Sequence, residues 1–273
     1  AAWRRRGTGV RQLELNLRRV VGPTMPDADL RQLSREAMRS YARYWLEFFR
    51  LPVLGRERIL GRTQLDGLDH VADLVASGRG VVLALPHSGN WDEAGAWLVL
   101  KGFPFTTVAE RLEPASVFDR FVAVREQIGM EVLPLTGSER NTLTVLMQRL
   151  RAGKVLCLVA DREIGDNGID VSFFGESARM PAGPATLALA TGAALMPATL
   201  WYSDDGPGGE WRGRIHPEIE PPAGGDRRAK AAAMTQHLAD VFAAGVAAHP
   251  RDWHMLQPLW TADRPAVARG GSE

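Results

Sequence analysis

Cysteine is nearly absent from this sequence, because Cys157 is the only one. A single thiol excludes an internal disulfide and argues against a cysteine-based zinc site. Cys157 lies in the apolar run of residues 155–160, so we interpret it as a packing residue rather than a nucleophile. His216, His249 and His254 lack the spacing of metal ligands. The sequence therefore predicts no metal site and structural roles for these three histidines.

Long hydrophobic runs and an excess of one charge are also missing. No apolar run approaches the roughly 20 residues that a membrane-spanning helix needs, and no signal-peptide pattern is present. The formal net charge is +1, so the molecule as a whole does not favour a polyanionic partner. With 45% hydrophobic and 24% charged residues, the composition excludes disordered and fibrous classes and predicts one globular domain over residues 1–273.

The first twenty residues depart from this charge balance. Glu14 is the only acid there, against six arginines: Arg4, Arg5, Arg6, Arg11, Arg18 and Arg19. Val10, Leu13 and Leu17 recur at helical spacing in the same stretch, which is typical of a helix on an anionic membrane surface. Nucleic acid is the weaker interpretation, because basic residues do not gather around aromatic pairs elsewhere. The chain opens without Met, and we expect a more membrane-seeking segment to precede it.

Strand and helix patterns alternate along the rest of the chain. We predict strands at 62–66, 80–85, 105–111, 131–135, 154–160, 169–174, 194–202 and 210–216. We predict helices at 11–21, 27–50, 68–76, 93–100, 114–128, 138–151, 181–191 and 226–248. This order indicates an α/β fold with a central, mostly parallel (mixed) sheet and helices on both faces. We expect 169–174 to be an edge strand and the last two strands to add an antiparallel edge.

One histidine occupies the position at which such sheets place their chemistry. His87 follows the apolar strand 80–85, and Asp92 begins the next helix after a tight Ser-Gly-Asn turn. This turn can bring the Asp92 carboxylate back to the imidazole, which would orient His87 as a general base for a hydroxyl proton. The alternative interpretation of His87 is a satisfied polar residue at a strand end.

A second charged group follows another strand. Asp161, Arg162 and Glu163 come directly after strand 154–160. If both strands are central and parallel, these side chains and His87 meet at the same edge of the sheet. A solvated loop with a surface ion pair is the alternative.

The residues around His87 carry a family resemblance. His87 and Asp92, within the run from Gly80 to Gly95, look like the His-x4-Asp/Glu motif of glycerolipid-type acyltransferases. The run most closely resembles the lysophospholipid-acyltransferase-like branch, which holds lipid A late acyltransferases and the actinobacterial phosphatidylinositol mannoside acyltransferase. The resemblance extends over about residues 10–260 and includes the His-Pro-x-x-Trp element at 249–253. It implies a glycerolipid-acyltransferase-like fold, with membrane-associating helices at 1–50 packed on an α/β core at 60–262.

The resemblance also implies roles for the acidic residues. Asp161 and Arg162 match an (Asp/Glu)-(Arg/Gln) step in the related enzymes, so His87 and Asp161 become the proton-transfer partners and Asp92 orients His87. In the mannoside acyltransferase this acid is Glu, and Asp161 is one methylene shorter. Donors near Arg162 or backbone N–H groups would stabilise the oxyanion.

Further site residues follow from the same match. Arg125 takes the place of a substrate-recognising arginine, although an exposed helix-end arginine is the alternative. We expect Arg162, Glu110 and Trp91 to bind substrate as well. Residues 173–184 resemble a Phe-Phe-Gly and Pro-x-Gly segment, in which Gly183 and Arg179 would meet coenzyme A; a plain tight turn before a helix is the alternative.

The expected function is therefore a membrane-associated O-acyltransferase. It would move palmitoyl from acyl-CoA, a co-substrate rather than a permanently bound cofactor, to a mannose 6-hydroxyl of phosphatidylinositol mannoside. It would lie peripherally on the cytoplasmic side of the cell membrane and bind no nucleic acid. Three alternatives remain open: a lipid A-type or other glycolipid acyltransferase, a thioesterase or hydrolase using the same His–acid pair, and a non-catalytic anionic-lipid-binding protein.

Overall fold

A computed structural model describes residues 3–110, 114–135, 142–163, 165, 167–203 and 210–263. Its helices are α1 (Thr8–Val21), α2 (Asp27–Arg50), α3 (Arg56–Arg62), α4 (Leu68–Ala76), α5 (Trp91–Leu100), α6 (Ala115–Gln127), α7 (Thr142–Arg151), α8 (Gly183–Thr191) and α9 (Arg227–Ala248). Its strands are β1 (Thr63–Asp66), β2 (Val81–Leu85), β3 (Phe105–Ala109), β4 (Glu131–Pro134), β5 (Val155–Val159), β6 (Ile169–Phe173), β7 (Glu176–Met180), β8 (Ala194–Ser203) and β9 (Glu210–Ile215).

Seven strands form the central sheet, in the order β1-β9-β8-β2-β5-β3-β4. The five strands from β8 to β4 are parallel, whereas β9 pairs antiparallel with β8 and parallel with β1. The predicted α/β fold with a mostly parallel, mixed sheet is confirmed. The predicted antiparallel pair exists, but β9 is not an edge strand, because Thr63–Asp66 pairs along its outer side.

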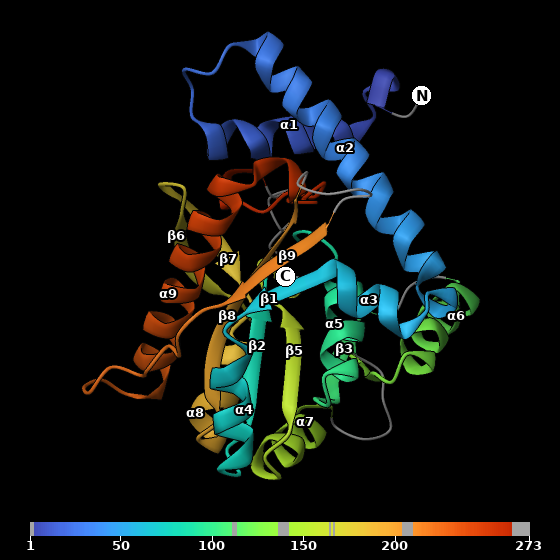
Figure 1. Ribbon diagram of the computed structural model, residues 1–273. Coiled ribbons are helices and arrows are strands. Elements are labelled where there is room, and N and C mark those ends of the chain that lie inside the picture. Colours follow the sequence, from blue (N-terminus) through green and yellow to red (C-terminus); the bar gives the residue numbers. More distant parts are fainter. Residues whose placement is uncertain are drawn as a thin grey trace.

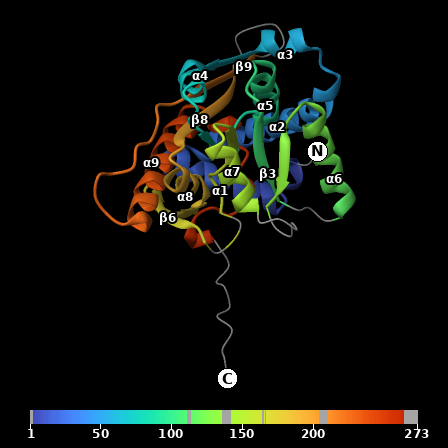
Figure 2. The ribbon, with the colours of Figure 1, turned by 90° about the horizontal axis from the view of Figure 1, so that it is seen from below.

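Helices cover both faces of this sheet, and the alternation of side chains decides which residues meet which helices. Val81, Leu83 and Leu85 of β2 pack toward α4 and α5. Val82 and Ala84 pack on the opposite face, toward α7, α8 and α9. Figure 2 shows α4 and α5 on one side of the sheet and α7 and α8 on the other. Because both faces are buried, β2 is apolar throughout rather than alternating.

The strand predicted at 169–174 belongs to a separate hairpin. β6 pairs antiparallel with β7 in a two-stranded sheet, and Ile169 lies opposite Met180. Phe174 and Gly175 connect the two strands with φ values of 51° and 78°, as a tight primed hairpin turn requires. The predicted short edge strand is confirmed, and it pairs with β7 in this hairpin rather than with the seven-stranded sheet.

The two N-terminal helices lie together at one end of the molecule (Figure 1). Leu13 and Leu17 of α1 pack against Leu30 and Ala37 of α2. Asn16, buried in this layer, donates hydrogen bonds from its amide to two backbone carbonyls of the C-terminal segment, at 2.8 and 3.0 Å. Among the described residues, no helix combines the length and apolar character needed to cross a bilayer.

Candidate active site

His87 is held at the carboxyl edge of the sheet by a short, tightly bonded loop. The Ser88 hydroxyl donates to the Leu200 carbonyl at 2.7 Å, and the Gly89 N–H donates to the Asp252 carbonyl at 2.9 Å. Gly89 has φ 62°, and a Cβ there would lie 2.9 Å from the Leu200 carbonyl carbon. Only glycine fits this position. Asn90 then caps α5 by accepting the Glu93 N–H at 3.0 Å.

The imidazole of His87 faces Asp161, which follows β5. The His87 Nδ1 and an Asp161 carboxylate oxygen are 2.5 Å apart. The other carboxylate oxygen accepts the His87 backbone N–H and the Trp253 indole N–H, each at 2.9 Å. The predicted meeting of these residues at one sheet edge is confirmed, since β2 and β5 are parallel neighbours.

The environment keeps Asp161 ionised. Burial alone would raise the pKa of this fully buried carboxyl. The charge of His87 and the hydrogen bonds from His87 and Trp253 lower the pKa below its usual range. In the neutral tautomer of His87 that donates its Nδ1–H to this carboxylate, the lone pair lies on Nε2. The His87 side chain is 29% exposed, so this second nitrogen belongs to a ring that a substrate can reach.

Asp92 has another partner than the one predicted. Its carboxylate binds Arg125 through two contacts, Nε at 2.6 Å and an Nη at 3.0 Å, and accepts the Tyr44 hydroxyl at 2.8 Å. The prediction that Asp92 orients His87 was wrong, because the first turn of α5 directs Asp92 toward α2 and α6. Asp161 is the residue that orients His87.

Arg125 is correspondingly committed to an internal ion pair. Its side chain is mostly buried over the ring of Phe48, 5.2 Å from the ring centre. Burial would lower the pKa of the guanidinium, but the charge and hydrogen bonds of Asp92 raise it. Arg125 does line the cavity described below, yet its two hydrogen bonds to Asp92 leave fewer of its guanidinium N–H groups for the predicted substrate phosphate.

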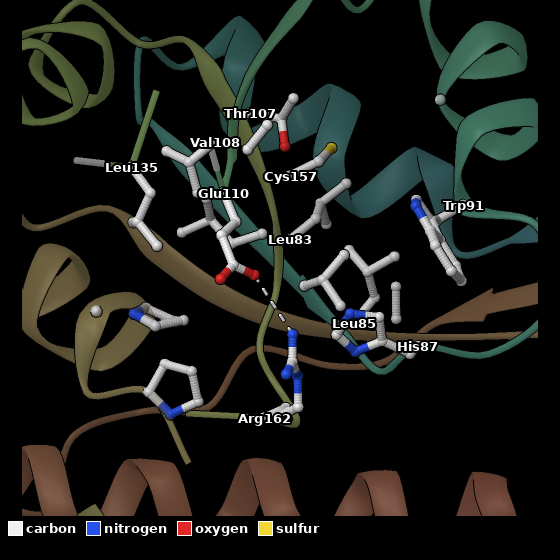
Figure 3. Close-up of a pocket in the computed structure, with 18 of the residues that line it drawn as sticks. Leu83, Leu85, His87, Trp91, Thr107, Val108, Glu110, Leu135, Cys157 and Arg162 are labelled. Atoms are coloured by element: carbon white, nitrogen blue, oxygen red, sulfur yellow. Dashed lines mark ion pairs between the residues drawn. The ribbon is translucent and has the colours of Figure 1, made fainter. Parts of the chain in front are cut away.

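A cavity of about 1290 Å³ opens beside His87. Its lining includes the aromatic side chains Tyr41, Tyr44, Trp45 and Trp91. Below them the wall is mostly apolar and reaches into the layer between the sheet and α5, where Leu83, Leu98 and Cys157 lie. Figure 3 shows Leu83, Leu85 and Cys157 on the sheet side of this space. The site thus joins a histidine–carboxylate pair to a compartment suited to a hydrocarbon chain.

Comparison with known proteins identifies the family of the chain. A family model described as bacterial lipid A biosynthesis acyltransferase matches residues 1–262. The chain belongs to this family. It is 50% identical over 264 residues to a Mycolicibacterium smegmatis protein named phosphatidylinositol mannoside acyltransferase, which covers 96% of this chain and 83% of that protein. The same comparison gives 49% identity over 259 residues with a Mycobacterium tuberculosis protein of that name, covering 93% and 78%.

A more distant relative spans part of the same region. A Haemophilus influenzae protein named lipid A biosynthesis acyltransferase is 21% identical over 170 residues, 62% of this chain and 52% of that protein. The family resemblance inferred from the His87 motif is confirmed, and the chain is an acyltransferase.

Three predicted substrate-binding residues lie on the acyltransferase cavity. Arg162 and Glu110 face each other across it, with an Nη–Oε distance of 3.6 Å; Figure 3 shows Arg162 pointing toward Glu110. The Trp91 ring stands edge-on to His87, with the ring centres 5.5 Å apart. Trp91 also stacks on Tyr44, with ring centres at 4.3 Å. The structure therefore places Arg162, Glu110 and Trp91 where they can contact a substrate.

The two residues predicted to bind coenzyme A lie in different places, and only one of them lines the cavity. Gly183 begins α8 and lines the cavity, and a Cβ placed there would have no atom within 4 Å apart from those of its chain neighbours and its own helix backbone. Arg179 lies on β7 and does not line the cavity. Its guanidinium is engaged by Asp170 at 3.3 Å and by the Gly168 carbonyl at 2.9 Å. The structure therefore does not bring Arg179 to the acyltransferase site, because Arg179 lies on a strand of the β6–β7 hairpin.

The sequence interpretation missed several residues of the site. Trp253 bonds Asp161, and His254 lines the cavity with its Nε2 2.9 Å from the Ser40 hydroxyl. Burial lowers the pKa of His254 to about 3, so its ring is neutral. The His-Pro-x-x-Trp element was the available signal for Trp253. Cys157 lines the cavity as a neutral thiol, because burial raises its pKa.

Proposed function

We propose that this acyltransferase moves a palmitoyl group from acyl-CoA to a mannose 6-hydroxyl of phosphatidylinositol mannoside. The observation that carries the proposal is the His87–Asp161 pair at the mouth of an apolar cavity. This arrangement puts a base for a hydroxyl proton beside a compartment for an acyl chain. The acceptor follows from the names of the two mycobacterial relatives at about 50% identity. A primary hydroxyl is the least hindered nucleophile on a hexose, which favours the 6-position.

The proposed reaction begins with proton transfer from the mannose hydroxyl to His87 Nε2. The mannose oxygen attacks the thioester carbonyl, and the resulting tetrahedral intermediate carries an oxyanion. The carbon–sulfur bond then breaks, and the thiolate takes the proton from His87 to leave as free coenzyme A thiol. Asp161 stabilises the imidazolium that exists between the two proton transfers. The guanidinium of Arg162 supplies positive charge on the same cavity for the oxyanion.

The polar end of the donor fits the outer part of the cavity. Arg162, Gly183 and Pro184 line this part, beside the first turn of α8. Backbone N–H groups at a helix start favour phosphate oxygens, although Pro184 supplies none in this turn. Apart from the flanking residues and the helix's own backbone, no atom would lie within 4 Å of a Cβ at Gly183. The coenzyme A phosphates would lie here, with the acyl chain directed past His87 into the apolar layer.

We further propose that the enzyme binds peripherally to the cytoplasmic face of the membrane through the end of α2. Leu46, Phe49 and Val53 are 58%, 62% and 82% exposed, unusually high values for large apolar side chains. Phe49 stacks on Trp45, with ring centres at 6.0 Å, and Trp45 lines the cavity. The exposed apolar surface therefore continues into the wall of the site, which gives a lipid substrate a short path out of the bilayer.

The test is free thiol release from palmitoyl-CoA with purified wild type and His87→Ala, with and without phosphatidylinositol mannoside in vesicles. We expect acceptor-dependent release from the wild type that falls by about 10²–10⁴-fold in His87→Ala, the usual contribution of a general base. The acylated glycolipid should be recovered in the same reactions, with the ester on the mannose 6-oxygen.

Other outcomes reject the proposal in distinct ways. Equal thiol release without acceptor would identify a hydrolase. Transfer to a lipid A precursor but not to the mannoside would retain the chemistry and replace the acceptor. Unchanged vesicle binding in a Phe49→Ser, Val53→Ser variant would reject the proposed membrane contact.

A further inference from the structure

The apolar residues that line the cavity fall into two groups, and we call the space beside each group a branch. One branch descends between α5 and the strands β2, β5 and β3, and its lining includes Leu85, Leu83, Cys157, Thr107, Phe105, Gly95, Leu98 and Met130. The other crosses toward the sheet edge at β9 and β1, and its lining includes Ala198, Leu200, Ile215 and Leu65. We call these the descending branch and the lateral branch.

Strand register gives the depth of the descending branch. Leu83 lies opposite Cys157, and Val81 lies opposite Val155, which in turn lies opposite Phe105. Phe105 is therefore level with Val81, four residues below Leu85, which corresponds to about 13 Å along the strands at 3.3 Å per residue. Figure 3 shows Leu85 beside His87, and Leu83 and Cys157 further along the wall. A long hydrocarbon chain needs a compartment of this depth.

A glycine of α5 makes room for the side chains at the far end of this branch. A Cβ on Gly95 would lie 2.6 Å from the Met130 Cε and 2.9 Å from the Phe105 Cζ. The tips of Met130 and Phe105 therefore occupy the place that a side chain at position 95 would take. Both residues are buried, at 4% and 6% exposure, and all three line the cavity. A methyl group at position 95 would displace these tips, and the adjoining open space is the branch itself.

We infer that Gly95, together with Phe105 and Met130, sets the length of acyl chain that the enzyme accepts. The inference rests on the proposed function, since it assigns the acyl chain to the descending branch of that same site. The tips of a methionine and a phenylalanine side chain can move aside for a new methyl group at a lower energetic cost than backbone atoms can. The branch would therefore become shorter in Gly95→Ala without loss of the fold, and alanine is also the better helix residue.

The experiment compares Gly95→Ala and Met130→Ala with the wild type across acyl-CoA donors from octanoyl-CoA to stearoyl-CoA, with phosphatidylinositol mannoside as acceptor. We expect Gly95→Ala to shift the preferred donor to a shorter chain and to lower kcat/KM for palmitoyl-CoA at least tenfold relative to that donor, because one methylene in an apolar pocket is worth about 10–200-fold. Met130→Ala should shift the preference to a longer chain.

Gly213 offers a matched control on the lateral branch. A Cβ there would lie 2.5 Å from Leu65 Cδ1 and 2.6 Å from Leu200 Cδ2, which are again tips of side chains that line the cavity, and 3.1 Å from the Thr199 carbonyl oxygen. Gly213→Ala should leave the chain-length profile unchanged. A shifted profile in Gly213→Ala with an unchanged one in Gly95→Ala would overturn the inference and assign the chain to the lateral branch. Equal profiles in all variants would overturn it as well.

A binding measurement separates this inference from the proposed function. Calorimetry with free fatty acids of graded length needs neither coenzyme A nor a glycolipid. Gly95→Ala should weaken the binding of palmitate more than that of laurate, at least tenfold in the ratio of the two dissociation constants. Failure of transfer to the mannoside, with this result intact, would reject only the proposed acceptor or donor. A constant ratio would reject the role of Gly95.

Discussion

Two buried carboxylates in the same site hold opposite kinds of partner. Asp161 binds the imidazole of His87, whereas Asp92 binds the guanidinium of Arg125, and both carboxylates are almost fully buried. An imidazole gives and takes a proton near neutral pH, but a guanidinium stays charged. The first pair can therefore perform general-base chemistry, while the second can only hold α5, α6 and α2 together. The comparison shows that the partner of a carboxylate, rather than its burial, decides its role.

Asp161→Asn breaks the first pair most directly. The asparagine can still accept the Trp253 N–H, but it offers an N–H₂ group to His87 Nδ1 and favours the wrong tautomer. We expect kcat for acceptor-dependent thiol release to fall by about 10²–10⁴-fold with little change in thermal stability. A change of only a few-fold would mean that His87 does not need this carboxylate.

Asp92→Asn tests the second pair through stability. It leaves the buried Arg125 guanidinium without its counter-charge, which costs about 3–5 kcal/mol in comparable buried pairs. Denaturant unfolding measures the loss, and Arg125→Met added to Asp92→Asn should recover much of it. A variant of normal stability that has lost only activity would return Asp92 to the role first predicted for it, beside His87.

Glu93 sharpens the comparison, because neither of its carboxylate oxygens accepts a well-aligned hydrogen bond from the described residues, and the nearby Trp211 indole N–H only partly offsets the effect of burial. Burial raises its pKa from 4.5 to about 7, an effect that the nearby Arg62 partly offsets and Glu47 reinforces. The unfolded chain loses this proton at lower pH than the folded one. Stability contributed by the protonated form is therefore present below pH 4.5 and is lost as the pH rises to about 7.

Glu93→Gln removes this dependence. Between pH 4.5 and 7, the free energy of unfolding of the wild type should fall by roughly 3 kcal/mol relative to Glu93→Gln. Unfolding by urea at several pH values measures the difference. A constant difference across this range would show that Glu93 ionises normally in the folded protein.

Tyr44→Phe is expected to have the smallest effect. The phenolic hydroxyl donates one hydrogen bond to Asp92 at 2.8 Å, and Asp92 keeps both contacts to Arg125 without it. We expect a loss of about 0.5–1.5 kcal/mol in unfolding free energy and transfer activity within a few-fold of the wild type. A large fall in activity would connect the second pair to the chemistry.

Local patterns predicted most elements well, because their signals are local. The apolar run of β2 and the long helix α9 both lie where the sequence predicts them, within one residue. The contact between His87 and Asp161 was also predictable, since it requires only that β2 and β5 be parallel neighbours. Proximity in sequence misled for Asp92, because the start of a helix turns successive side chains in different directions. Arg179, which was predicted to bind coenzyme A, does not reach the cavity, because a turn after β6 folds its strand, β7, back against β6.

The site depends on bonds from a C-terminal segment that is synthesised after both His87 and Asp161. Trp253 donates its indole N–H to Asp161, although it lies 92 positions further along the chain. The same segment receives the Gly89 N–H and gives the His254 N–H to the His87 carbonyl at 2.7 Å. A nascent chain that has already placed His87 beside Asp161 still lacks all three bonds. The histidine–carboxylate pair is thus completed by a segment that is synthesised after both of its members, so a chain without this segment lacks the bonds that hold the base in place.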